Sequence, residues 1–166
     1  MSVESVREYL KKWGKDTSVR EFSQSCATVE LAALAAGVSP ARIAKTLSFK
    51  GPAAAGAMAC ILVVAAGDAR IDGKKFKDCF GVKSKMLSAE DALTYTGHAV
   101  GGVCPFAVKN PEAGIYLDRS LKRFATVFPA CGSSNSVMEL TGEELFAISG
   151  AKGWVDVCKG WDDGQD

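Results

Sequence analysis

Apolar and polar residues follow helix-like and strand-like periods along this chain of 166 residues. Apolar side chains recur at helical spacing between Val3 and Trp13, with Ser2 placed to cap a helix and Gly14 placed to end it. Similar combinations of a capping residue, an apolar face and a terminating glycine predict helices over 28–37, 72–81, 88–95 and 141–148. A serine-proline pair predicts a further short helix over 39–44.

Short apolar runs and strict alternation predict strands between these helices. The run over 60–66 predicts a central strand that is buried on both faces. Other strands are expected over 19–22, 45–49, 106–108, 115–118, 126–131, 137–140 and 154–157, with a hairpin loop over 51–56 and a turn over 132–135. Six to eight strands and five helices without an internal repeat predict one α/β domain of mixed, α+β-like character over 1–158. Residues 159–166 are expected to form a frayed tail.

Composition and charge exclude several classes of protein. Twenty basic and nineteen acidic residues give a formal charge of +1, so no global field attracts nucleic acid or a membrane. The longest apolar stretch, 57–66, is too short to span a bilayer, and the amino-terminal pattern is not that of a signal peptide. We therefore expect a cytoplasmic protein without a membrane or DNA partner.

The six cysteines and the single histidine do not form a metal-binding pattern. No two cysteines are close enough in sequence for a C-x-x-C hook, and a disulfide framework is typical of short secreted chains. We expect reduced thiols, most of them buried, with neither a metal nor a cofactor.

A glycine-rich segment over 96–106 carries the most unusual local chemistry. It holds His98, the glycines Gly101 and Gly102, and Cys104 followed by Pro105. Glycines admit positive φ and close approach of a ligand, and proline stiffens the loop, so exposed amides here could bind a carbonyl oxygen or a phosphate. The alternatives are an ordinary connection into a strand and a nucleophile-base pair formed by Cys104 and His98.

Lysines supply two further candidates. Lys45 is predicted at a helix-to-strand junction, which would hold its side chain rigidly while its tip stays exposed. Lys74, Lys75 and Lys77 form a small basic face, either merely solvated or in contact with a nucleic acid backbone.

Five segments in order resemble one known family. They are Thr28-Val29-Glu30, the stretch 39–47, the stretch 67–72, the glycine loop with Val103 and Phe106, and Ile115-Tyr116-Leu117-Asp118. Together they resemble the YbaK/ProX family, which is related to the editing insertion domain of bacterial prolyl-tRNA synthetases. The resemblance covers roughly residues 1–158.

The resemblance implies trans-editing, in which the ester of a mischarged aminoacyl-tRNA is hydrolysed, and a curled, largely antiparallel mixed sheet or partial barrel with flanking helices. Lys45 matches the lysine of the family that engages the terminal adenosine, and residues 101–105 match its pocket loop. The implied partners are the tRNA acceptor end and an aminoacyl-tRNA synthetase. A non-catalytic tRNA-binding or nucleotide-binding module of the same fold remains an alternative, as does a Cys104/His98 thiol hydrolase.

The expected site thus contains few reactive side chains. Because an aminoacyl ester is already activated, positioned water and oxyanion donors worth about 10²–10³ in rate each can suffice. Cys104 replaces a serine common in relatives, and Cys131 occupies a segment where some relatives have a histidine, so the amino acid that is removed stays open. The expected catalytic residues are Lys45, Gly101 and Gly102; the expected substrate-binding residues are Phe22, Thr46, His98, Val103, Cys104, Pro105, Phe106, Asp118, Ser133, Ser134 and Asn135.

Overall fold

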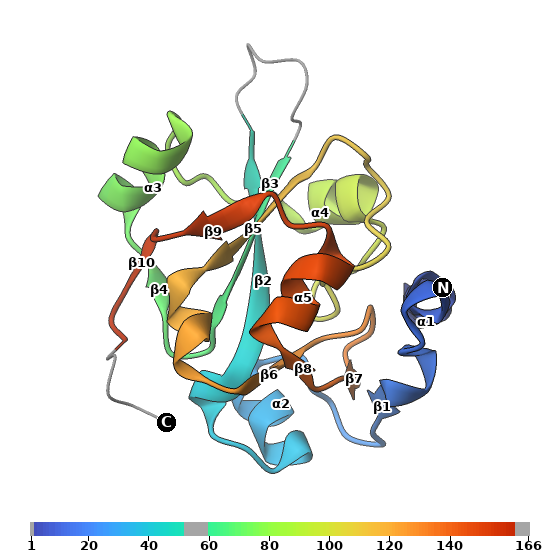
Figure 1. The fold of residues 1–166 in the computed structure, drawn as a ribbon. Helices are drawn as coiled ribbons and strands as arrows, with labels where there is room; N and C mark the ends of the chain where they lie inside the picture. The colour runs from blue at the N-terminus through green and yellow to red at the C-terminus, as the bar shows by residue number, and fades with distance from the viewer. Residues whose placement is uncertain (1, 52–59, 162–166) are drawn as a thin grey trace.

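A curled six-stranded mixed sheet forms a half-barrel in the middle of the molecule (Figure 1). The structure is a computed structural model and describes residues 2–51 and 60–161. The order in this sheet is β8-β6-β2-β3-β5-β9, and two small two-stranded sheets, β1-β7 and β4-β10, complete the described strands. The strands are β1 (Arg20–Glu21), β2 (Ile43–Lys50), β3 (Cys60–Ala66), β4 (Arg70–Ile71), β5 (Gly114–Asp118), β6 (Thr126–Pro129), β7 (Ser136–Val137), β8 (Leu140–Thr141), β9 (Gly153–Val155) and β10 (Cys158–Lys159).

The long β2-β3 pair forms the centre of the sheet. The two strands run antiparallel from Ala44↔Ala66 to Lys50↔Cys60. Parallel pairing adds β6 on one side and β5 and β9 on the other, and β8 is antiparallel to β6. All seven residues of β3 are buried, as its apolar run predicts. The predicted mixed α/β architecture is therefore confirmed.

Helix ends follow the predicted capping residues closely. The helices are α1 (Ser2–Leu10), α2 (Val29–Ala36), α3 (Gly73–Phe80), α4 (Ala89–Thr96) and α5 (Gly142–Ser149). The Thr28 hydroxyl accepts a hydrogen bond from Leu31 N at 3.1 Å, and Thr141 forms the predicted capping box with Glu144. In Figure 1, α2 lies at the lower end of the molecule, and α3 and α4 lie on opposite sides of its upper end. No helix among the described residues is both long and apolar enough to cross a bilayer.

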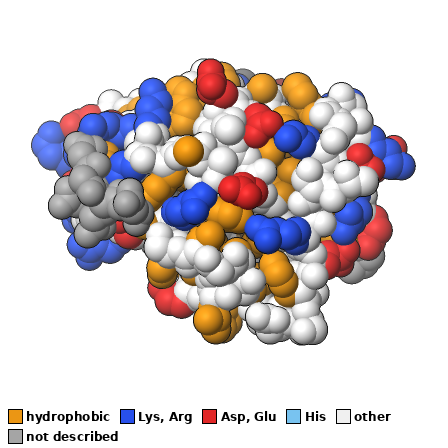
Figure 2. Space-filling model, turned by 60° about the horizontal axis from the view of Figure 1, so that its bottom comes forward, with side chains coloured by type: hydrophobic (Ala, Val, Ile, Leu, Met, Phe, Trp, Pro, Cys, Tyr) orange, Lys and Arg blue, Asp and Glu red, His pale blue; other side chains and the backbone are white. Residues whose placement is uncertain are grey.

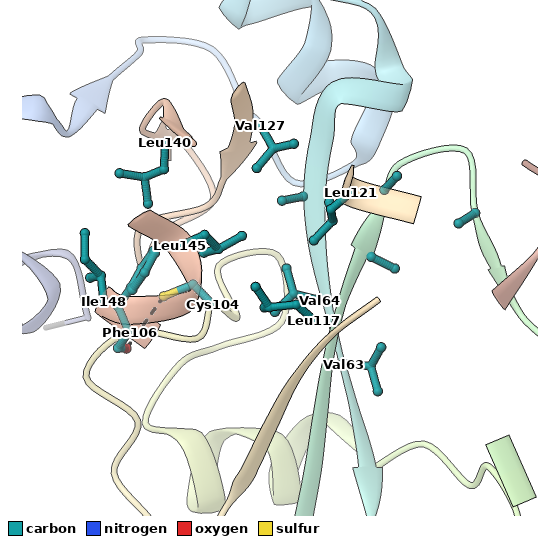
Figure 3. Close-up of a cluster of buried hydrophobic side chains, with 14 of the residues drawn as sticks. Val63, Val64, Cys104, Phe106, Leu117, Leu121, Val127, Leu140, Leu145 and Ile148 are labelled. Atoms are coloured by element: carbon teal, nitrogen blue, oxygen red, sulfur yellow. Dashed lines mark hydrogen bonds between the residues drawn. The ribbon is translucent and has the colours of Figure 1, made fainter. Parts of the chain in front are cut away.

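The glycine loop enters the hydrophobic core instead of leaving as a strand. Cys104 and Phe106 are fully buried, and Figure 3 shows them beside Leu145 and Ile148 of α5. The strand predicted over 106–108 is wrong, since Ala107 adopts a φ of 52°, which is incompatible with extended backbone. Burial of this loop fixes its position against the sheet.

Three other predictions need correction. The helix expected over 39–44 is a single 3₁₀ turn (Pro40–Arg42), so β2 begins at Ile43 and Lys45 lies inside a strand and not at a junction. The strand expected over 137–140 is divided between β7 and β8. Lys159, assigned to the frayed tail, pairs with Arg70 in the β4-β10 sheet. Residues 162–166 and all but Gly51 of the predicted hairpin loop lie outside the described residues.

Candidate active site

A cavity of about 310 Å³ opens along the outer edge of β2. Its walls come from the segment leading into α2, the glycine loop, the segment before α4, and β6 with β7. The wall is mostly apolar, and among the residues that the structure describes no Asp or Glu contributes to it. The lining residues are Cys26, Ala27, Thr28, Val29, Ala32, Ile43, Ala44, Lys45, Thr46, Leu47, Ser48, Met86, Leu87, Ala92, Val100, Gly101, Val103, Phe128, Ala130 and Val137.

Four of the predicted site residues meet at this cavity. Lys45 and Thr46 come from β2, and Gly101 and Val103 come from the glycine loop. The two pairs are at least 55 positions apart in sequence (101 − 46 = 55), so the fold, through β2 and the buried loop, brings them together. The predicted pairing of Lys45 with the glycine loop thus has a geometric basis.

The Lys45 ammonium is held by backbone carbonyls of the turn after β3. Its Nζ donates to Gly67 O at 3.3 Å and to Ala69 O. Burial lowers the pKa of Lys45, because the charged form is deprived of water, while the Asp68 carboxylate acts in the opposite direction. An ammonium has three donors, so two carbonyl bonds leave one donor for a ligand.

A partly buried ion pair fixes this turn. Arg123 Nη1 and Nη2 donate to the two Asp68 carboxylate oxygens at 2.9 and 2.6 Å, and the Arg123 side chain is 3% exposed. Bidentate pairs of this kind have a defined geometry, so the turn that positions Lys45 is itself anchored. The sequence shows Gly67-Asp68 as a turn but gives no indication of the distant arginine.

The glycine loop presents amides of two kinds. Gly102 N donates to Ala99 O at 2.9 Å and is therefore used inside the loop. Within the described part of the chain, the amides of Gly101 and Val103 have no hydrogen-bond acceptor, and both residues line the cavity. Gly101 has a φ of 95°, which favours glycine. Of the two glycine amides expected to serve a ligand, that of Gly102 is used inside the loop, and the amides without an acceptor beside the cavity belong to Gly101 and Val103.

Cys104 and His98 do not form a reactive pair. His98 Nε2 is 2.7 Å from Phe106 O, a contact that needs a proton on Nε2, so this nitrogen cannot accept the thiol proton although Sγ lies 3.6 Å away. Burial lowers the pKa of His98 and raises the pKa of Cys104 to about 12. Neither residue lines the cavity, and both are 1% exposed or less. The arrangement gives a neutral pair that holds the loop, with buried Pro105 between Cys104 and Phe106.

The turn of residues 133–135 holds a neighbouring segment of the cavity wall in place through hydrogen bonds. Asn135 O accepts from Phe22 N, and Asn135 Nδ2 donates to Phe22 O, both at 2.8 Å. Ser133 Oγ donates to Asn135 Oδ1 at 2.9 Å, and Ser134 O accepts from Cys26 N. These bonds hold the segment over 22–26, and the predicted residues 22, 133, 134 and 135 do not themselves line the cavity.

Two further predicted positions lie away from the cavity. Asp118 is fully buried and accepts from Ser120 N at 3.0 Å and Val157 N at 2.9 Å, so it joins backbone segments. Cys131 is fully buried in the core, and its neighbour Ala130 lines the cavity instead. The predicted basic face of α3 is partly neutralised, because Lys74 pairs with Asp78 and Lys75 with Asp156.

Sequence reasoning missed most of the apolar wall. Val29 and Ala32 lie one helical turn apart on α2, and Met86 and Val100 are 55% and 67% exposed. Apolar helix positions ordinarily indicate core, so periodicity alone could not assign these residues to a cavity. Figure 2 shows the lower face of the molecule, where basic and acidic side chains are interspersed among hydrophobic ones near its centre.

Comparisons with known proteins agree with this fold. The chain is 54% identical over 163 residues to YwhH of Bacillus subtilis, described as uncharacterised, covering 98% of this chain and all of that protein. A solved structure described as a candidate trans-editing enzyme for prolyl-tRNA synthetase superposes with a TM-score of 0.84 at 29% identity, covering 96% and 98% of the two chains. The solved structure of the hypothetical protein APE2540 gives 0.79 at 30% identity, covering 93% and 99%. The sequence profile of the aminoacyl-tRNA editing domain matches residues 23–148, and the chain therefore belongs to that family.

Proposed function

We propose that this protein is a trans-editing aminoacyl-tRNA deacylase that hydrolyses the ester of a mischarged tRNA. The observation that carries the proposal is the cavity at which Lys45, Thr46, Gly101 and Val103 meet. The similarity to a candidate trans-editing enzyme supports it. The tRNA acceptor end is the proposed ligand, and an aminoacyl-tRNA synthetase is a secondary proposed partner.

The polar groups around the cavity suit a reaction that needs positioning more than a nucleophile. The remaining donor of Lys45 would bind a phosphate or hydroxyl oxygen of the terminal nucleotide. The free amides of Gly101 and Val103 would stabilise negative charge on the ester carbonyl as water attacks, each worth about 10²–10³ in rate. The apolar wall would receive the amino-acid side chain.

The reaction would proceed by attack of water on the ester carbon. The carbonyl electrons move onto oxygen, and collapse of the tetrahedral intermediate breaks the bond to the ribose oxygen, which takes up a proton in exchange for the one that the attacking water gives up. The free amino acid and the intact tRNA terminus are the products. A thiol nucleophile is disfavoured, because Cys104 is buried away from the cavity with a raised pKa.

A panel of mischarged tRNAs, each with a labelled amino acid, tests this function. We expect at least one member to be deacylated, and Lys45→Ala to reduce that rate by about 10-fold or more, since it removes a charge-assisted hydrogen bond. Lys50→Ala is the matched control, because Lys50 lies at the exposed end of the same strand and does not line the cavity. Binding of tRNA without turnover of any panel member would favour the non-catalytic binding module. Equal loss in both lysine variants would refute the role of Lys45.

A further inference from the structure

The outer edge of β2 exposes alternate backbone groups. In a strand, the N–H and C=O of one residue point to the same edge, and those of the next residue point to the other. Leu87 N donates to Ser48 O at 3.0 Å, and Lys50 N donates to Lys85 O at 2.8 Å. The backbone carbonyl of Ser48 and the backbone amide of Lys50 therefore both point away from β3. Thr46 lies two residues before Ser48 and therefore directs its own N–H and C=O to this outer edge.

This edge is interrupted at Thr46. The pairing with β6 ends at Ala44, and the pairing with the segment before α4 begins at Ser48. In the part of the chain that the structure describes, the N–H and C=O of Thr46 have no hydrogen-bond partner on this side, and its buried Oγ1 also has none. Backbone groups next to an apolar wall are nearly always paired, so an unpaired set at one residue that lines a cavity indicates a ligand.

The unpaired N–H and C=O of Thr46 are complementary to the carbonyl and the amino group of an aminoacyl ester. An aminoacyl ester carries a nitrogen and a carbonyl on neighbouring carbons, with the spacing found in any residue of a strand. Two residues that face each other in an antiparallel pair exchange two hydrogen bonds, and peptides use this mode when they add to a sheet edge. One aminoacyl group can therefore satisfy both Thr46 backbone groups at once.

We propose that the aminoacyl group binds as a one-residue strand on the open edge of β2, with its α-amino group donating to Thr46 O and its carbonyl accepting from Thr46 N. This rests on the proposed function and names the recognised class: aminoacyl esters with a free α-amino group. Thr46 is a positioning residue that acts through its backbone. No carboxylate lines the described cavity, so neutral oxygens serve as the acceptors for the amine.

The direction of pairing would also exclude substrates whose α-amino group carries an acyl group. In the antiparallel orientation the amino end points toward Ser48, where the segment of residues 85–87 already occupies the edge. An acyl group on the nitrogen, as in a peptidyl ester, would collide with that segment. The gap therefore fits a single aminoacyl residue, and the ester oxygen with its ribose must leave the plane of the sheet, because β6 occupies the edge at Ala44.

Binding of non-hydrolysable probes to the wild-type protein tests the proposal without requiring turnover. The probes are adenosine with alanine joined through a 3′-amide, the propionyl counterpart that lacks the amine, and the N-acetylalanyl counterpart. Alanine is chosen because its methyl side chain is small, so that binding does not also test the size of the cavity. We expect the alanyl probe to bind roughly 10-fold to 100-fold more tightly than the other two, as for one hydrogen bond to a charged group.

Amide hydrogen exchange followed by NMR gives the site-specific readout. The alanyl probe should slow exchange at Thr46, whereas the amides of Lys45 and Leu47, which pair with β3, should be protected with or without it. Equal affinities for the three probes, unchanged exchange at Thr46, or no binding of the alanyl probe would each overturn the proposal. A protein that shows the expected pattern but deacylates no mischarged tRNA would refute the enzymatic function and leave this binding mode standing.

Discussion

Replacement of Gly102 by alanine is the sharpest structural test of the glycine loop. A Cβ at this position would lie 2.8 Å from both Ser133 Cα and Ser133 N, and 2.9 Å from Gly132 C. All three neighbours are backbone atoms, so no side-chain rotation can relieve the clash. Ordinary contact begins at 3.4 Å, so the loop and the turn over 132–135 must separate by about 0.6 Å (3.4 − 2.8). Overpacking of this kind destabilises a protein by about 1–3 kcal/mol.

The same displacement should reduce activity, because Gly102 lies between the two residues with free amides. A shift of about 1 Å in a positioned group costs on the order of 10²-fold in rate, so a shift of about 0.6 Å should cost roughly 10-fold. We therefore expect Gly102→Ala to impair deacylation of the best substrate in the tRNA panel even at temperatures at which the variant is folded.

Urea unfolding and the deacylation rate measure the two effects. Gly153→Ala in β9 is the matched control, because its added Cβ meets nothing within 4 Å and its backbone does not have positive φ. The control should unfold within about 0.5 kcal/mol of the wild type. If Gly102→Ala unfolded at the same urea concentration as this control and kept full activity, the packing argument for the loop would be refuted.

Three further predictions concern groups outside the cavity. Asp68→Ala should lower the free energy of unfolding by about 1–3 kcal/mol in urea titration, because it removes the bidentate partner of the Arg123 guanidinium, which keeps its bond to Ser120 O; a loss below about 0.5 kcal/mol would contradict this. Iodoacetamide at pH 8 should modify exposed Cys79 but not Cys104 in the folded protein, since burial raises the pKa of Cys104 to about 12; mass spectrometry that finds rapid Cys104 labelling would contradict its burial. Burial lowers the pKa of His98, so below about pH 6.5 the unfolded state binds the proton more readily and stability should fall as pH falls toward the folded pKa. His98→Leu should flatten this slope of stability just below about pH 6.5, and an unchanged slope would assign it to other groups.

The parts of the fold that depend on local sequence could be predicted. The capping threonines at 28 and 141 fix helix starts through bonds within three residues, and the apolar run of β3 can be satisfied only by burial on both faces. The residue at which the short helix after Ser39 ends was less predictable. Capping residues mark where a helix begins, but they do not reveal that Ile43 pairs with β6 and therefore already belongs to β2. Long-range pairing overrode the local preference there.

The candidate site was harder to predict because its polar groups are mostly backbone atoms. Sequence motifs drew attention to the side chains of His98, Cys104 and Asp118, and the structure uses all three to hold backbone in place. The conspicuous residues of the glycine loop thus drew attention to a segment that borders the cavity, but the residues that line the cavity there with amides lacking an acceptor are Gly101 and Val103.

Backbone groups would supply most of the proposed hydrolytic site in this chain, whose sequence contains a single histidine. Backbone amides and carbonyls need no particular side chain, but they bind a ligand well only if their positions are fixed before it arrives. Burial of His98 and Phe106 fixes the loop, and the Arg123 pair fixes the turn that holds Lys45. Substitutions at these buried supports should therefore affect turnover through displaced backbone, whereas exposed neighbours of the cavity should tolerate change.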